Sequence, residues 1–230
     1  MAQAVLPGNP PIEILLRRSA RARRISLRVS GLDGRVTLSL PKGVSSAEAL
    51  AFAETKSDWI RKHLAKQVEH LVPQIGGRIL WKGQEVEIRA AQVRRAQIMD
   101  GAMLVPPDPS MVPARIKALF KLQARDDLGA ATRRYADALG LKFGKITLRD
   151  TRSRWGSCST SGDLNYSWRL IMAPTEVLDY VAAHEVSHLV EMNHSAAYWQ
   201  VVASIYPDYA APRRWLHENG QRLHRYRFGD

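Results

Sequence analysis

Three prolines within four residues, Pro106-Pro107-Asp108-Pro109, separate two kinds of hydrophobic pattern in this chain. Proline fixes φ and has no amide hydrogen, so neither a helix nor a central strand continues through such a segment. Short apolar runs with glycine turns precede the prolines and predict strands, whereas apolar residues at helical spacing follow them. We therefore expect an α+β protein with a β-rich N-terminal domain, residues 1–108, and a C-terminal domain, residues 109–230.

The N-terminal part is expected to hold two groups of strands on either side of one long helix. The helix starts at Ser45 or Ser46, which with Glu48 forms a capping pattern, and it runs to about His70. A turn is expected at residues 31–34, where the sequence is Gly-Leu-Asp-Gly. The expected strands are residues 12–16, 24–29, 35–40, 78–81, 85–90, 96–99 and 103–105.

The C-terminal part is expected to be mainly helical, with a small sheet. Apolar residues recur at helical spacing from Val112 to Leu139, and Gly140 is suited to end that helix. Pro174 is suited to the first turn of another helix. The other expected elements are strands at residues 145–150 and 164–170, with a polar segment at 152–159 between them, and helices at 195–205 and 211–223.

The helix that follows Pro174 contains His184-Glu185-Val186-Ser187-His188, an H-E-x-x-H pattern. Residues four apart lie on one face of a helix, so both imidazoles can bind one metal ion, and neutral imidazoles suit zinc. Glu185 is turned away from both ligands and can take a proton from a water molecule on the metal. The pattern therefore predicts a zinc-dependent hydrolase with Glu185 as the catalytic base.

The third metal ligand is expected to be His194. A straight helix would carry the chain about 9 Å beyond His188 in six residues, so the helix must stop near Glu191 or Met192. Asn193 tolerates the left-handed conformation of such a stop, and Ser195 can cap the next helix. Glu191 is the rival ligand, but on a continuing helix it points away from the ion.

Other residues near this pattern are weaker candidates. Arg152, Arg154 and Trp155 are expected to line the cleft, where an arginine would bind an anionic group or an oxyanion. The alternative is a packed tryptophan with solvated arginines. Tyr198 is expected in the core, with the site within its reach. Cys158 is expected to be structural, and four histidines are expected at the surface: His63, His70, His217 and His224.

The net charge of the 230 residues is +12, which favours acidic partners such as nucleic acid or phosphorylated ligands. A solvated basic surface is the alternative. A single cysteine is compatible with a reducing compartment, and the chain lacks a signal-peptide pattern and an apolar run long enough for a membrane span. We therefore expect a cytoplasmic location and no membrane partner.

Three segments of the C-terminal part resemble the YgjP-like zinc metallopeptidases, which are related to the SprT-like proteases. They are Arg154-Trp155-Gly156-Ser157-Cys158, the pattern at residues 184–188, and Asn193-His194-Ser195 followed by Tyr198-Trp199. The resemblance implies a zincin-like catalytic domain, with His184, His188 and His194 as zinc ligands and Glu185 as the base. It also implies a polypeptide substrate, and it links SprT-like relatives to cleavage of DNA-linked proteins.

Three functions remain open at this point. A zinc metalloendopeptidase, with Glu185 activating a zinc-bound water that attacks the scissile carbonyl, is the leading hypothesis. A metal-dependent nucleotide phosphohydrolase is the second, because some YgjP-like proteins are described as acting on nucleotide phosphoanhydrides. Three histidines suit zinc better than the magnesium that such chemistry commonly uses. The third is a nucleic-acid-associated protein with a structural zinc, which would normally have four protein ligands.

Overall fold

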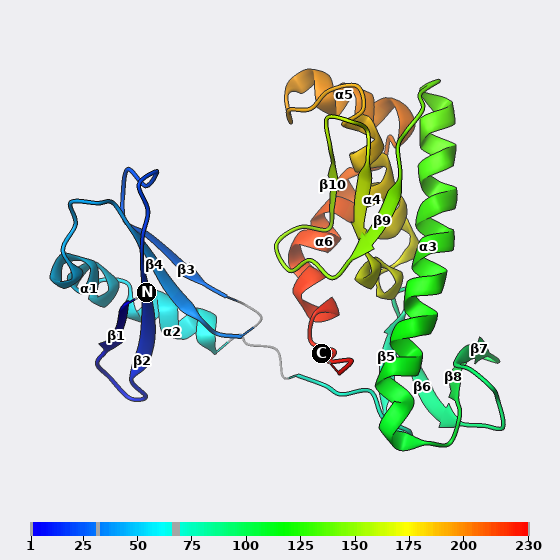
Figure 1. Cartoon of the computed structure of the whole chain (residues 1–230), viewed down its shortest axis with the longest axis horizontal. Coiled ribbons are helices and arrows are strands. Elements are labelled where there is room, and N and C mark those ends of the chain that lie inside the picture. Colours follow the sequence, from blue (N-terminus) through cyan, green and yellow to red (C-terminus); the bar gives the residue numbers. More distant parts are fainter. Residues whose placement is uncertain (1, 31–32, 66–69, 230) are drawn as a thin grey trace. The chain divides into compact units, whose positions relative to one another are not determined.

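The computed structural model describes residues 2–30, 33–65 and 70–229, and the chain forms two compact units, Met1–Glu69 and His70–Asp230 (Figure 1). The boundary expected after residue 108 falls instead within the second unit. Residues 78–105 lie in the second unit because their apolar side chains share one core with the helix that follows them; Ile88 and Ile116 both belong to it.

A four-stranded sheet forms the first unit together with two helices. The strands are β1 (Ala2–Leu6), β2 (Ile12–Arg18), β3 (Ser26–Val29) and β4 (Val36–Leu40). Their order is β1-β2-β4-β3, with β2 and β4 parallel and the other pairs antiparallel. Alternate residues of β2 and β4 are buried, so one face of the sheet covers the core of this unit. Strands β2, β3 and β4 were predicted from the sequence, whereas β1 was not.

The helix expected between Ser45 and His70 is two helices, α1 (Ser46–Glu54) and α2 (Ser57–Leu64). Ser45 and Glu48 form the expected capping box: the amide of Glu48 donates to the Ser45 hydroxyl, and the Glu48 carboxylate accepts from the amide of Ser45. Residues 66–69 of the expected helix lie outside the described residues, as do Gly31 and Leu32 of the expected turn.

The second unit begins with a four-stranded sheet, ordered β5-β6-β8-β7. Its strands, all predicted, are β5 (Arg78–Trp81), β6 (Gln84–Ala90), β7 (Gln97–Met99) and β8 (Ala102–Val105). The β5–β6 turn has positive φ at both Lys82 and Gly83. Gly83 packs against Pro174, and its amide donates to the carbonyl of Met172 at 3.0 Å. This hairpin therefore supports the start of the helix that begins at Thr175.

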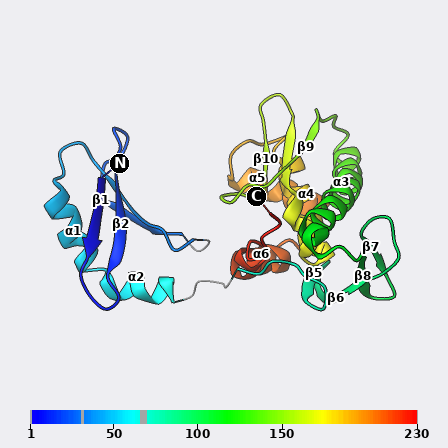
Figure 2. The same ribbon diagram turned by 60° about the horizontal axis from the view of Figure 1, so that its bottom comes forward.

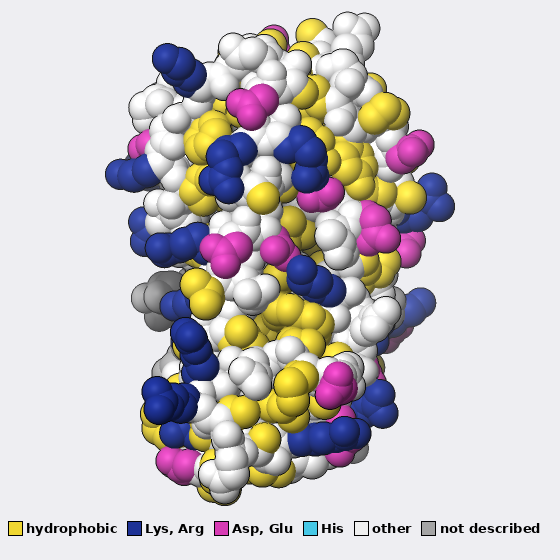
Figure 3. Space-filling model, turned by 90° about the vertical axis from the view of Figure 1, so that its right-hand side faces the viewer, with side chains coloured by type: hydrophobic (Ala, Val, Ile, Leu, Met, Phe, Trp, Pro, Cys, Tyr) yellow, Lys and Arg dark blue, Asp and Glu magenta, His cyan; other side chains and the backbone are white. Residues whose placement is uncertain are grey.

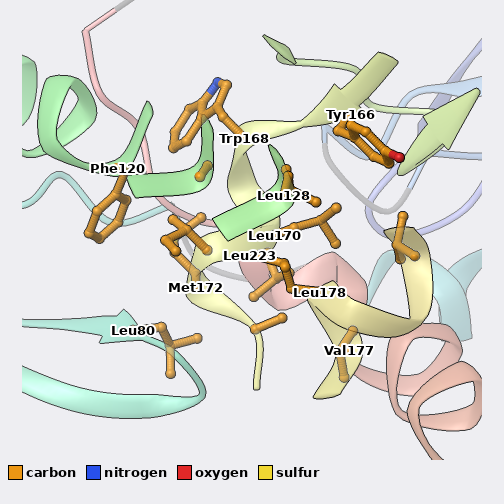
Figure 4. Packing of buried hydrophobic residues seen from close by; sticks show 14 of the residues in the cluster. Leu80, Phe120, Leu128, Tyr166, Trp168, Leu170, Met172, Val177, Leu178 and Leu223 are labelled. Atoms are coloured by element: carbon orange, nitrogen blue, oxygen red, sulfur yellow. The ribbon is translucent and has the colours of Figure 1, made fainter. Parts of the chain in front are cut away.

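The long helix α3 (Val112–Ala138) joins the two sheets of this unit. It ends as predicted, with Gly140 at a φ of 65°. One face of α3 is buried, and Phe120 and Leu128 on it lie beside Trp168 and Leu170 in the core (Figure 4). The core of the second unit is therefore built around α3.

A three-stranded sheet, ordered β10-β11-β9, covers the other end of α3. Its strands are β9 (Ile146–Arg149), β10 (Gly156–Cys158) and β11 (Leu164–Ser167). Strand β10 was not predicted, because it has three residues in a polar segment. The strand expected at 164–170 ends at Ser167, and η2 (Trp168–Met172) follows as a 3-10 helix that is buried throughout. A fully buried run has no period that separates the two structures.

Three further helices complete the unit: α4 (Thr175–Ser187), α5 (Ala196–Ile205) and α6 (Ala210–Leu223). Helix α4 lies alongside α3 and also contacts α5, α6 and β10 (Figures 1 and 2). It is the central element of this part of the fold. Within the described residues, no helix combines the length and the apolar character needed to cross a membrane.

Candidate metal centre

Helix α4 is the buried helix that the sequence predicted, and it brings the H-E-x-x-H residues into the interior. It ends at Ser187 with His188 as its C-cap, about one turn before the expected stop at residues 191–192. The chain then continues in tight turns, in which the amides of Leu189 and Val190 donate to the carbonyls of Val186 and Ser187. These turns redirect the chain so that it can return to the helix.

His184, His188 and His194 converge on one point. Their candidate ligand nitrogens all lie within 4.8 Å of one another, and the Nε2 atoms of His184 and His194 are 3.1 Å apart. Among residues 2–30, 33–65 and 70–229, this is the only such group of three or more His, Cys, Asp or Glu side chains. The arrangement can hold one metal ion.

His194 reaches the group from the loop between α4 and α5. Ser195 caps α5 as predicted, because its hydroxyl accepts from the amide of Tyr198 at 3.2 Å. Asn193 was expected in the left-handed conformation, and this expectation is wrong. Among the described non-glycine residues, only Lys82 and Asp100 have a positive φ. A short turn, in which the Ser195 amide donates to the Asn193 carbonyl at 2.7 Å, replaces it.

Neighbouring groups hold the imidazoles in place. The carbonyl of Glu191 lies 3.1 Å from Nδ1 of His188 and can accept its hydrogen, which leaves Nε2 for a metal. Glu191 thus contributes its backbone, and its carboxylate does not belong to the group. Tyr198 is fully buried behind the site: its ring stacks on His188, and its hydroxyl donates to the carbonyl of His184 at 2.9 Å.

The electrostatics fit a metal ion with nitrogen ligands. Burial lowers the pKa of His184 to about 3, with further lowering by His188 and His194, and burial also lowers the pKa of His188. Both rings are therefore neutral at pH 7 and offer lone pairs. Three imidazoles with no thiolate or carboxylate in the group match the ligand set of catalytic zinc sites.

Glu185 is buried beside the histidines, with 4% of its surface exposed. Burial raises the pKa of its carboxyl to about 8, an effect that the positive charge of Arg154 partly offsets. The carboxyl packs against the backbone of Gly156 in β10, where an added Cβ would lie 2.6 Å from Glu185 Cδ. Only glycine leaves room at position 156. Gly156 belongs to the motif at residues 154–158, but its contact with Glu185 was not predicted.

The histidines and Glu185 line a cleft of about 380 Å³. Arg154 and Trp155 are among its lining residues, whereas the exposed Arg152 is not, and Tyr198 lies behind the histidines rather than in the cleft. The apolar walls were not predicted, because they come from separate elements. They include Tyr180, Val181, Met192 and Leu216.

The remaining candidates fall outside the group. Cys158 lines the cleft, and burial raises the pKa of its thiol, which disfavours the nucleophilic thiolate. His224 is buried, not at the surface as predicted, because its ring packs on Trp155 at a centroid distance of 4.9 Å. His217 and His70 are exposed as predicted. His63 is half-buried, and its Nδ1 lies 2.7 Å from the Trp59 carbonyl.

The chain as a whole matches a known protein family. The sequence model of the YgjP-like metallopeptidase domain matches residues 23–219. The chain belongs to this family. As a YgjP-like metallopeptidase it has polypeptides as its substrate class. A comparison with curated proteins found no match. Among solved structures, the metallopeptidase zymogen of Pyrococcus abyssi abylysin is similar to part of the chain, with 19% identity over 40% of this chain and 93% of that chain, and a TM-score of 0.36.

Proposed function

We propose that this YgjP-like protein is a zinc-dependent endopeptidase with His184, His188 and His194 as zinc ligands and Glu185 as the general base. The observation that carries the proposal is the convergence of three imidazoles beside one buried carboxyl in an open cleft. A zinc ion held by three histidines would polarise the scissile carbonyl and lower the pKa of a bound water molecule.

The protein's own groups then have distinct roles. Glu185 takes up the proton of the attacking water at its carboxylate and returns it to the leaving amine. Its raised pKa suits both steps, because a group that titrates near neutral pH can accept and donate a proton. Arg154, exposed in the same cleft, binds a negatively charged group of the substrate. Gly156 leaves the carboxyl room to stay beside the histidines.

The base assignment is tested with Glu185→Gln. This change keeps the shape of the side chain but removes its basicity, so zinc content should stay near that of the unchanged protein while turnover of a disordered polypeptide such as casein falls by about 10²–10⁴-fold. Zinc is measured by mass spectrometry and turnover by the release of peptides.

Glu191→Gln is the matched control, because Glu191 contributes its backbone carbonyl to the site. It should retain both zinc and activity. Loss of zinc in Glu191→Gln would favour the rival ligand, and full turnover in Glu185→Gln would refute the base. Hydrolysis of UTP by the same preparation, with casein left intact, would show a nucleotide phosphohydrolase instead.

A further inference from the structure

The first unit contains a long segment that is rich in arginine and has no acidic residue. Between Glu13 and Asp33 the sequence has no Asp, Glu or Lys, and it has six arginines. They are Arg17, Arg18, Arg21, Arg23, Arg24 and Arg28. By contrast, Lys and Arg side chains alternate with Asp and Glu on the face of the molecule seen in Figure 3. The positive charge of this segment is therefore not balanced locally.

Most of these arginines have no partner in the described part of the chain. Arg18 is structural, because its guanidinium donates to the carbonyls of Lys42 and Val44. The other five are exposed and form no hydrogen bond or ion pair with another described residue. Packing of the first unit does not account for them.

Two of the five lie on the sheet face that points away from the core. Arg17 of β2 is paired with Ser39 of β4, and Arg28 of β3 is paired with Thr37 of the same strand. Because β4 separates β2 from β3, the two arginines come from strands about 10 Å apart. They border a hollow of about 550 Å³, whose other residues are Leu15, Ser30, Asp33, Arg35, Thr37 and Ser39.

The chemistry of this face suits phosphate groups. Guanidinium groups bind phosphate with two parallel hydrogen bonds, and serine and threonine hydroxyls donate to phosphate oxygens. Two carboxylates lie near it: Asp33, which forms an ion pair with Arg35 at 3.4 Å, and Glu13, at the far end of β2. The unpaired arginines extend beyond the hollow into the β2–β3 connection, so the face spans more than one phosphate.

The residues of the sheet also exclude two classes of partner, single-stranded nucleic acid and membrane surfaces. None of the residues of β1 to β4 is aromatic, so the face lacks the rings on which single-stranded bases stack. Among the described residues of these strands, Val5 is the only large apolar side chain that is well exposed. One such side chain is too little to anchor the protein to a membrane surface. We propose that this arginine face binds the phosphate backbone of double-stranded nucleic acid without reading its bases.

The test measures binding of a labelled 30-base-pair DNA duplex to the full chain by fluorescence anisotropy at several salt concentrations. Contact with about four phosphates should lower the affinity on the order of 100-fold between 50 and 200 mM salt. In Arg17→Ser/Arg28→Ser, the slope of log affinity against log salt should decrease by about 2. Both side chains are exposed, and circular dichroism checks that the fold is retained.

The matched control is Arg78→Ser/Arg89→Ser. It removes the same charge from exposed arginines of the second unit that pair with Glu85 and Glu87. Binding should be unchanged in this control. Equal weakening in both double variants would show attraction to net charge alone and would overturn the proposal. So would binding to phosphatidylserine vesicles without binding to the duplex. Peptidase activity is not a readout, so this test is independent of the proposed function.

Discussion

Glu185 and Gly156 come from separate elements, yet each restricts the other. The carboxyl lies against the strand backbone, and this contact together with the surrounding core removes water from it and raises its pKa to about 8. Since φ of Gly156 is not positive, crowding rather than backbone strain excludes a larger residue. The close approach of Glu185 to the backbone is therefore what requires glycine at position 156.

Gly156→Ala is expected to displace the Glu185 carboxyl, because an added Cβ would overlap it. Overpacking of this kind costs about 1–3 kcal/mol of stability, and we expect polypeptide turnover to fall at least about tenfold with zinc retained. Denaturant unfolding and peptide release measure the two effects. Gly129→Ala is the control, since it lies in α3 with room for a methyl group and should gain about 0.5–1 kcal/mol. Unchanged turnover in Gly156→Ala would contradict the contact.

His224 should make stability depend on pH. Burial, with the nearby charge of Arg169, lowers its pKa from 6.5 to about 4, so the folded protein favours the neutral ring. Its contribution to the free energy of unfolding is full above pH 6.5 and is lost as the pH falls toward 4, by up to about 3 kcal/mol.

Urea unfolding at pH 7 and pH 5, with a chelator present, measures this effect. The difference in stability between the two pH values should be smaller in His224→Gln than in the unchanged protein. The exposed His217→Gln, on the same helix, should behave as the unchanged protein does. An identical pH dependence in all three proteins would contradict the assignment to His224.

At the scale of elements, the end of α4 and the start of α5 together build the candidate metal centre. Helix α4 supplies two imidazoles on one face, and the chain turns back within a few residues so that the third can join them. Tyr198 in the first turn of α5 spans the junction, because it bonds the His184 carbonyl and stacks on His188. The two helices are thereby joined at the candidate metal ligands.

Tyr198→Phe should weaken zinc binding by about tenfold, since the loss of a bond that orients a ligand typically has such an effect. Competition with a chromogenic chelator measures the affinity. Tyr206→Phe is the control: its hydroxyl donates to the carbonyl of Glu176, near the opposite end of α4. That variant should lose stability without losing zinc affinity. Equal zinc affinities in the two variants would show that Tyr198 only supports the fold.

At the scale of the molecule, each of the two units has a hydrophobic core of its own. The core of the second unit contains residues from Ile79 to Phe228, and that of the first unit ends at Ile60. All of the candidate metal ligands lie in the second unit. The sheet β5–β8 belongs to it because the side chains of this sheet complete the core around α3.

A fragment of residues 70–230 is therefore expected to unfold cooperatively and to bind zinc, whereas a fragment of residues 109–230 should not fold. The shorter fragment lacks Ile79, Ile88 and Met103, each fully buried in the core. Thermal unfolding followed by circular dichroism, with zinc analysis, measures both. A folded 109–230 fragment would support the boundary that the prolines predicted.

The sequence alone determined most elements of this protein and the residues of its candidate metal centre. Spacing of apolar residues, caps and glycines act over a few residues, so most of the strands, α3 and α4 could be predicted from local rules. The convergence of His184, His188 and His194 was also expected, because it depends on one helix and the loop after it. Tertiary structure decided the contact of Gly156 with Glu185, the burial of His224, and the assignment of residues 78–105 to the second unit. Those outcomes depend on which distant surfaces pack together, and hydrophobic periodicity does not carry that information.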